Sequence, residues 1–158
     1  MGLPTLTRLP VAVLAVGLAL AAAPVAAYVP AVEAGGLLHL SGQLPFEDGN
    51  LMTGRAGEDR DLAYATSAAQ KCALMILAQA EKALGSLDRI ERVVKLGVFV
   101  NSAGSFTDQP KVANGASELM VALFGDTGRH ARSAVGVPVL PLGAAVEVDA
   151  IIEIGTAL

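Results

Sequence analysis

Residues 145–154 read AVEVDAIIEI, and this stretch decides the fold of the chain. Apolar residues occupy every even position from Val146 to Ile154, while Glu147, Asp149 and Glu153 stand between them. A period of two places the two sets on opposite faces of a β-strand. The stretch therefore predicts a strand that covers a core with one face and leaves acidic side chains on the other.

Four earlier runs are also typical of strands, because they are short, rich in β-branched residues and bounded by turn residues. They lie at 28–32, 37–44, 93–100 (VVKLGVFV) and 132–140. The first two are joined by Glu33-Ala34-Gly35-Gly36, whose glycines suit a hairpin turn. Residues 45–57 contain Asp48-Gly49-Asn50 and Gly54, and we expect them to form an exposed loop.

Two helices fill the gaps between these strands. Apolar residues recur at helical spacing from Ala65 to Leu84, after the acidic residues of 58–61 and before Gly85. A second helix is expected over 108–124, with Gly125 after it. The order ββαβαββ predicts an α+β fold in which one mixed sheet carries both helices on one face. Its other face then needs cover, which favours an oligomer.

Composition excludes several classes of function. The 158 residues carry 11 Lys+Arg against 15 Asp+Glu, a net charge of −4, so nucleic acid is not an expected partner. One cysteine and two histidines leave little material for a metal site, and we expect neither metal nor cofactor. Phosphate-loop, dinucleotide, zinc-protease and α/β-hydrolase motifs are all absent from the sequence.

The N-terminal segment 1–27 is set apart by its composition. Residues 11–27 read VAVLAVGLALAAAPVAA, which matches a secretory signal but is short and Pro-interrupted for a membrane span. Two alternatives stay open: a cleaved export signal, giving a periplasmic or secreted protein, or an apolar arm on a cytoplasmic protein. Residues 28–158 form the folded domain in either case.

Charged residues on the last two strands are candidates for chemistry. If the strands 132–140 and 145–154 pair as a hairpin around residues 141–143, Arg132 and Glu147 lie near each other at one end. Arginine binds a carboxylate through two parallel hydrogen bonds, and glutamate can deprotonate a water. An ordinary structural ion pair is the alternative. His130 could tune anion binding near Arg132 or lie in an interface.

The chain resembles the RidA (YjgF, endoribonuclease L-PSP) family from Tyr28 to Ile154. The segments that carry the resemblance are YVPAV at 28–32, LSGQLP at 40–45, VFVN at 98–101, ARSAV at 131–135 and VEV at 146–148. The resemblance implies a chorismate-mutase-like fold in a homotrimer with a central barrel. It also implies three sites in clefts between neighbouring subunits.

The activity implied by the resemblance is that of a 2-iminobutanoate/2-iminopropanoate (enamine/imine) deaminase, a hydrolase that needs no cofactor. Arg132 would hold the substrate carboxylate, and Glu147 would assist the water that adds to the imine. The substrate-binding residues implied are Tyr28, Ser41, Gly42, Asn101 and Ala134.

This chain departs from many active members at two positions. Ala134 replaces a cysteine and Gly136 replaces an acidic residue. A second hypothesis is therefore a noncatalytic trimer that binds small carboxylates or has a regulatory role. We expect no endoribonuclease activity, because the acidic chain lacks an aromatic and basic surface.

Overall fold

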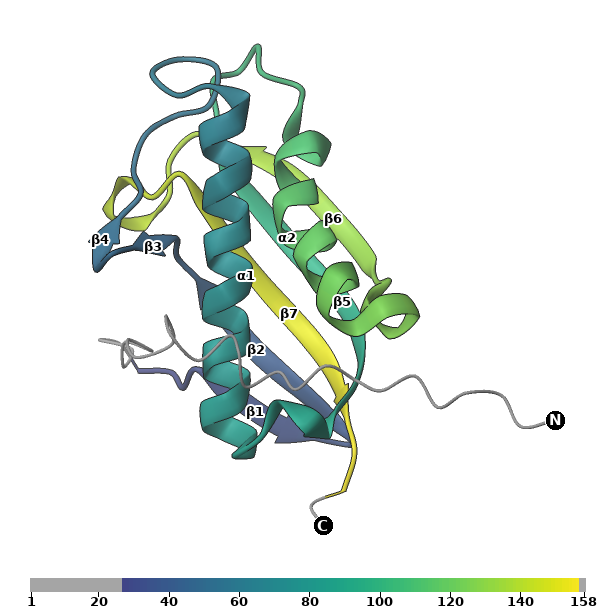
Figure 1. Ribbon diagram of the computed structural model, residues 1–158. Coiled ribbons are helices and arrows are strands. Elements are labelled where there is room, and N and C mark those ends of the chain that lie inside the picture. The colour runs from purple at the N-terminus through teal and green to yellow at the C-terminus, as the bar shows by residue number, and fades with distance from the viewer. Residues whose placement is uncertain (1–26, 157–158) are drawn as a thin grey trace, which may run out of the picture.

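A single five-stranded sheet organises the chain, with strand order β1-β2-β7-β5-β6 (Figure 1). The computed structural model describes residues 27–156. The strands of this sheet are β1 (Ala31–Ala34), β2 (Leu37–Gln43), β5 (Ile90–Asn101), β6 (Ala131–Val137) and β7 (Val146–Ile154). The two helices are α1 (Leu62–Leu84) and α2 (Gln109–Phe124), so the predicted order ββαβαββ is confirmed.

The sheet is mixed, as expected. β1 and β2 form the predicted hairpin, and its turn uses Gly35 and Gly36 with φ of 60° and 77°. These are conformations that a side chain disfavours. β7 lies antiparallel between β2 and β5, and β6 runs parallel to β5. The last strand thus occupies the centre of the sheet.

The predicted hairpin between the last two strands is wrong. β5 lies between β6 and β7, which do not pair. The physical reason is the crossover: α2 returns the chain so that β6 adds in parallel at the outer edge of β5. Residues 138–145, with a short turn at Pro141–Gly143, then carry the chain over to the other side of β5.

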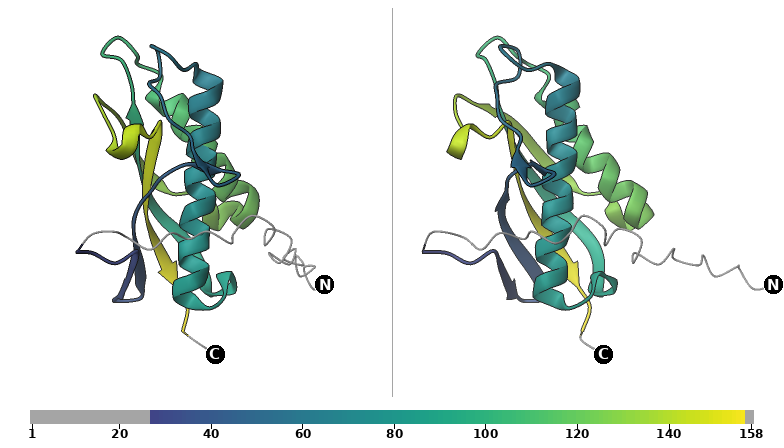
Figure 2. Two further views of the ribbon diagram at one scale, coloured as in Figure 1. Left: turned by 90° about the vertical axis from the view of Figure 1, so that its left-hand side faces the viewer. Right: turned by 60° about the vertical axis from the view of Figure 1, so that its left-hand side comes forward.

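Both helices cover the same face of the sheet, as Figures 1 and 2 show. Asp61 caps α1 by accepting a hydrogen bond from the Tyr64 amide at 2.8 Å, and Gly85 ends the helix in the left-handed conformation. The helices approach closely at Gly115, where an added Cβ would overlap the main-chain oxygen of Thr66. Small residues on the helices therefore determine how closely they pack.

The core lies between the helices and the sheet. The even-numbered residues of β7, from Val146 to Ile154, are buried there with the apolar face of α1. Glu147 and Asp149 project from the other face of β7 and are only partly buried. The alternation predicted from residues 145–154 is confirmed, and it identifies an open face of the sheet.

The prediction of an exposed loop over 45–57 is only partly right. A small hairpin forms there from β3 (Phe46–Glu47) and β4 (Asn50–Leu51), and Met52 and Ala56 are buried. The Ala145 amide donates to the Met52 carbonyl at 3.0 Å, which ties the segment to the sheet. The sequence did not predict the burial of Met52 and Ala56, because both apolar residues stand among turn residues.

The N-terminal segment falls almost wholly outside the described residues, so its predicted role stays a prediction. Within residues 27–156, no helix is both long enough and apolar enough to cross a membrane.

Candidate functional site

Strand β6 and helix α2 together hold the guanidinium of Arg132. Nη1 of Arg132 donates to Oδ1 of Asn114 at 2.9 Å and to Oγ of Ser117 at 3.0 Å. Nη2 donates to the carbonyl of Pro110 at 3.2 Å. Positions 110, 114 and 117 lie on one face of a helix because they are spaced by four and three residues. We call Arg132, Pro110, Asn114 and Ser117 the arginine cluster.

The cluster leaves part of the guanidinium free. These three hydrogen bonds use three of the five N–H donors of an arginine. The Nε–H and one Nη2–H have no hydrogen bond to any residue in the described part of the chain, and the side chain is partly exposed. Two free donors on a fixed planar cation can bind both oxygens of a carboxylate.

Asn114 and Ser117 were missed by the sequence reasoning. On the sequence they are polar residues of an amphipathic helix, a pattern that usually indicates a solvent-facing side. The only available signal was their spacing of three residues, which places both on the face that also carries Pro110. That spacing indicates a partner only once β6 is known to lie beside α2.

A β-bulge places Gly42 against Glu147. Leu40 pairs with Ala150 and Gln43 pairs with Val148, so Ser41 and Gly42 stand opposite Asp149 alone. The extra residue turns the Cα–H of Gly42 toward Glu147, and a Cβ there would overlap the Glu147 carboxylate. Bulges re-aim side chains in this way beside many active sites. Gly42 thus makes room for the carboxylate.

The environment of Glu147 changes its acidity. Partial burial raises the pKa of Glu147 above its usual value, and the neighbouring carboxylate of Asp149 raises it further. Oδ1 of Asp149 accepts a hydrogen bond from the Gly97 amide at 3.0 Å. Glu147 therefore gives up its proton nearer to neutral pH than an exposed glutamate does, which suits a group that transfers protons.

The segment before β1 lies beside this carboxylate region. Oγ of Ser41 donates to the Val29 carbonyl at 2.8 Å, and the Ser41 amide donates to the Pro30 carbonyl at 2.9 Å. Tyr28, which directly precedes Val29, is 55% exposed. In the described residues, no hydrogen bond joins the Tyr28 or Ser41 side chain to Glu147. We use the name glutamate cluster for Gly42 and Glu147 together with Ser41, next to Gly42 in the chain, and Tyr28, next to the residue that Ser41 contacts.

The two clusters do not meet within one chain. Glu147 pairs with Phe99 and projects from the open face, whereas Arg132 pairs with Leu96 and turns toward α2 on the helix face. The expected proximity of Arg132 and Glu147 along a hairpin is therefore wrong. Ala134 faces the helices beside the arginine cluster and packs against the core.

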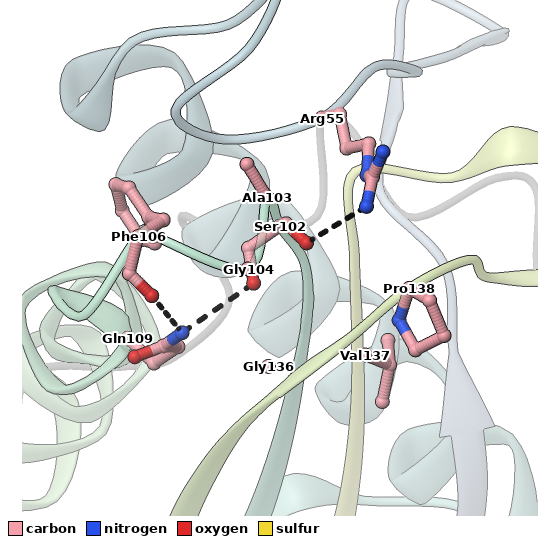
Figure 3. Close-up of a pocket in the computed structure, with 9 residues that line it drawn as sticks. All are labelled: Arg55, Ser102, Ala103, Gly104, Phe106, Gln109, Gly136, Val137 and Pro138. Atoms are coloured by element: carbon pink, nitrogen blue, oxygen red, sulfur yellow. Dashed lines mark hydrogen bonds between the residues drawn. The ribbon is translucent and has the colours of Figure 1, made fainter.

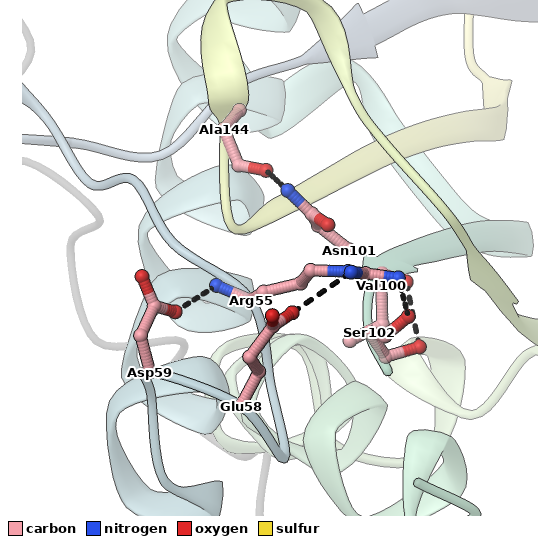
Figure 4. Close-up of polar contacts among 7 residues, drawn as sticks. All are labelled: Arg55, Glu58, Asp59, Val100, Asn101, Ser102 and Ala144. Carbon is pink, nitrogen blue, oxygen red and sulfur yellow. Dashed lines mark hydrogen bonds and ion pairs between the residues drawn. The ribbon is translucent and has the colours of Figure 1, made fainter. Parts of the chain in front are cut away.

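Asn101 belongs to neither cluster in this chain. It is 5% exposed, and its Nδ2 donates to the Ala144 carbonyl at 3.1 Å (Figure 4). Its own carbonyl accepts from the Ala56 amide at 2.8 Å, and its amide donates to Ala145 at 3.0 Å. These contacts join β5 to two loops, which is a structural role. Among residues 27–156, Oδ1 of Asn101 has no hydrogen-bond partner.

A separate pocket of about 290 Å³ lies at the end of β6 (Figure 3). None of the seven predicted site residues lines it. Gly136 lies in its wall, where a Cβ would stand 2.6 Å from Oγ of Ser102 and 2.7 Å from Nε2 of Gln109. Any larger residue at position 136 would displace this pair of side chains. The loss of an acidic residue at Gly136 therefore has a local structural reason.

Thiol and metal chemistry receive no support from the described residues. Cys72 is fully buried on α1, and burial raises the pKa of its thiol well above the usual value. In residues 27–156, no three His, Cys, Asp or Glu side chains are grouped to hold a metal ion.

Known proteins resemble this chain along most of its length. A family model described as "YjgF/chorismate mutase-like, putative endoribonuclease" matches residues 8–154. Protein TCP17 of Trypanosoma cruzi is 54% identical over 143 residues, 89% of each chain. The crystal structure of Atu1372 from Agrobacterium tumefaciens, whose function is unknown, matches with a TM-score of 0.80 and 52% identity, covering 84% of this chain and 86% of that one. RidA from the Antarctic bacterium Psychrobacter sp. PAMC 21119 matches with a TM-score of 0.58 and 32% identity, covering 84% and 92%.

Proposed function

The chain belongs to the YjgF/chorismate-mutase-like family, and from that premise we propose that it is an imine deaminase. Its substrates are small 2-iminoacids such as 2-iminobutanoate and 2-iminopropanoate, and its products are 2-ketoacids and ammonia. The observation that carries the proposal is the guanidinium of Arg132, which three hydrogen bonds hold in place while its other two donors have no partner in the described part of the chain. A substrate carboxylate binds to those two donors.

The complete site forms between two subunits of a homotrimer. The arginine cluster lies at the β6 edge of the sheet and the glutamate cluster toward the β1 edge, so they belong to different surfaces of one chain. A head-to-tail contact brings unlike surfaces of two copies together, and three such contacts close a ring. Arg132 of one subunit then faces the glutamate cluster of its neighbour across the cleft.

Exposed apolar side chains support this assembly. The residues concerned are Val32 on β1, Val135 on β6 and two residues that follow β6; Val139 is 68% exposed and Leu142 is 79% exposed. Val135 faces away from the helices, beside Phe99. Such residues at both edges and on the open face are typical of surfaces that another subunit covers.

The reaction needs one proton carrier and a fixed substrate. The oxygen of a water molecule bonds to the imine carbon, the water loses a proton to the Glu147 carboxylate, and the same proton then passes to the nitrogen. The hydroxyl proton of the resulting carbinolamine then passes to the nitrogen through the same carboxylate. The carbon–nitrogen bond breaks, ammonia leaves, and the former hydroxyl oxygen remains as the carbonyl of the 2-ketoacid. Because the pKa of Glu147 is raised, this carboxyl can both take and return a proton nearer to neutral pH.

The test is hydrolysis of 2-iminobutanoate, generated in situ by an amino-acid oxidase and followed by semicarbazide trapping. The wild-type protein is expected to remove the imine faster than the spontaneous rate. Arg132→Ala is expected to lose the acceleration while its assembly, followed by light scattering, is unchanged. Equal rates for the two proteins would contradict the proposal.

A second candidate function is binding of small carboxylates without catalysis. The arginine cluster is complete within one chain, whereas the glutamate cluster lies on another surface, and this observation favours the second function. Calorimetry with 2-oxobutanoate separates the two. Binding that depends on Arg132, without accelerated imine loss, would support the binding protein over the enzyme.

We further propose that the protein is cytoplasmic and keeps residues 1–27 as an arm. The hydroxyl of Ser41 donates to the carbonyl of Val29, so cleavage after Ala27 would leave this contact on the second residue of the new chain. Intact-mass measurement of the protein from its native host tests this proposal. A mass lacking residues 1–27 would support export instead.

A further inference from the structure

His130 extends the arginine cluster by two hydrogen bonds. Its Nδ1 lies 2.6 Å from the Gly128 carbonyl, and its Nε2 lies 2.9 Å from Oγ of Ser117. A carbonyl oxygen can only accept, so Nδ1 carries a proton. Ser117 is also the residue that accepts from Nη1 of Arg132 at 3.0 Å. One hydroxyl therefore joins the imidazole to the guanidinium.

When His130 is neutral, the three hydrogen bonds run in one direction: Arg132 donates to Ser117, Ser117 donates to His130, and His130 donates to Gly128. Its Nε2 then carries a lone pair, so the Ser117 hydroxyl donates to it. The same oxygen accepts from Arg132, and His130 itself donates to Gly128. The imidazole thus fixes the Ser117 hydroxyl in the orientation that holds Nη1 of Arg132.

Protonation of His130 changes this arrangement without breaking it. Nε2 then donates to Oγ of Ser117, which has lone pairs for both His130 and Arg132. A second positive charge now stands within two hydrogen-bond lengths of the guanidinium. An anion bound at Arg132 interacts favourably with both charges.

Other charged groups near His130 are few. In the segment just before His130, Nε of Arg129 lies 3.4 Å from Oδ1 of Asp126 in the preceding turn. On α2, Glu118 is exposed and follows Ser117. On β5, the exposed Lys95 pairs with Ala131. In the proposed trimer, Glu147 of the partner subunit also faces Arg132 across the cleft, so it is a further titratable group of this region.

We propose that His130 is a positioning residue that couples carboxylate binding at Arg132 to the uptake of a proton. The proposal rests on the carboxylate site of the proposed function and adds its regulation by pH. Because such coupling is reciprocal, protonation of His130 must strengthen carboxylate binding by the same factor. Across two hydrogen bonds near the surface, we expect a factor of about 3 to 10.

The experiment is calorimetric titration of the full chain with 2-oxobutanoate at pH 5.5, 6.5 and 8.0, in buffers of different ionisation enthalpy. Wild-type protein is expected to bind about 3 to 10 times more tightly at pH 5.5 than at pH 8.0, with net proton uptake. Measured in a Glu147→Gln background, which removes the other titrating group of the proposed cleft, His130→Gln is expected to lose the pH dependence and the uptake. The Gln amide can still donate to Gly128 and accept from Ser117, so His130→Gln binds better at pH 8.0 than His130→Ala does.

The other histidine supplies the matched control. His39 is exposed on β2, far along the sheet from β6, and His39→Gln is expected to keep the wild-type pH dependence. Identical pH dependence with and without His130→Gln in the Glu147→Gln background would overturn the proposed coupling while Arg132-dependent binding still stood. Binding that survives Arg132→Ala would instead remove the carboxylate site and the coupling together. Absence of imine hydrolysis, with pH-dependent binding intact, would overturn the deaminase and leave the coupling supported.

Discussion

Gly42 and Glu147 lie against each other on neighbouring strands, and the glycine leaves open the space that the carboxylate fills. The contact depends on the bulge in β2, which sets two residues opposite Asp149 alone. Position 42 therefore has no side chain, and the partly buried carboxylate of Glu147 occupies the space that a Cβ would need. Gly42 therefore offers a way to move the carboxylate without removing it.

We predict that Gly42→Ala lowers kcat/KM for imine hydrolysis at least about tenfold, because general acid–base groups contribute on the order of 100-fold or more when well placed. The added Cβ must displace the Glu147 carboxylate. Initial rates at saturating and limiting imine measure the effect. Gly104→Ala is the control, since a Cβ at that position would have no atom of the described residues within 4 Å. Equal losses in both variants would show that the effect is not specific to Glu147.

Glu147→Gln should change how stability depends on pH. The pKa of Glu147 is raised in the folded protein, so the folded chain holds this proton at pH values where the unfolded chain has released it. The contribution of Glu147 to the free energy of unfolding therefore falls as the pH rises from about 4.5 through the raised pKa of the folded protein. The Gln side chain of the variant does not ionise, so the variant does not lose stability in this way. Urea unfolding at pH 4 and pH 8 should show the Gln variant gaining relative to wild type at the higher pH; a constant difference would contradict the raised pKa.

Gly115→Ala tests the close approach of the two helices. The new methyl group would overlap the main-chain oxygen of Thr66 on α1, which cannot swing away as a side chain can. Overpacking of this kind costs about 1–3 kcal/mol. Urea denaturation of the variant should show a lower midpoint with a similar slope. Gly104→Ala should leave the midpoint unchanged, and an unchanged midpoint in Gly115→Ala would show that the helices can separate freely.

Mixed trimers test whether two subunits share each site. Arg132→Ala and Glu147→Gln chains, co-expressed with different tags and purified through both, are each expected to be inactive alone. In any such mixture one of the three head-to-tail contacts combines an intact Arg132 with an intact Glu147, so activity should return to about a third of wild type. If both groups acted within one chain, mixing would restore nothing.

Local patterns along the sequence predicted most of the fold. The alternation over 145–154 predicted β7 with its buried and open faces, and the spacing from Ala65 to Leu84 predicted α1. These features depend on residues a few positions apart. The pairing of β6 with β5 instead depends on where α2 returns the chain, and the sequence between the strands does not encode that position in any short pattern.

The candidate site was predicted less completely for the same reason. Arg132 and Glu147 were found as charged residues on predicted strands, but their wrong pairing followed from treating β6 and β7 as neighbours. Asn114, Ser117 and His130 contribute through contacts between α2 and the start of β6. Such contacts join residues 13 to 18 positions apart along the chain, so no local spacing indicates them.

The bulge in β2 also limits how this chain can change in length. Before Ser41, side chains of β2 alternate in step with those of β7, and after Gly42 the two strands are in step again with one residue more on β2. Deleting either residue would keep the pairs on both sides and restore a regular ladder, but a single residue would then stand opposite Asp149 and the space beside the Glu147 carboxylate would change. We therefore expect relatives to keep their length here and to tolerate insertions at the turn of Gly35 and Gly36, where an added Cβ meets no atom of the described residues within 4 Å.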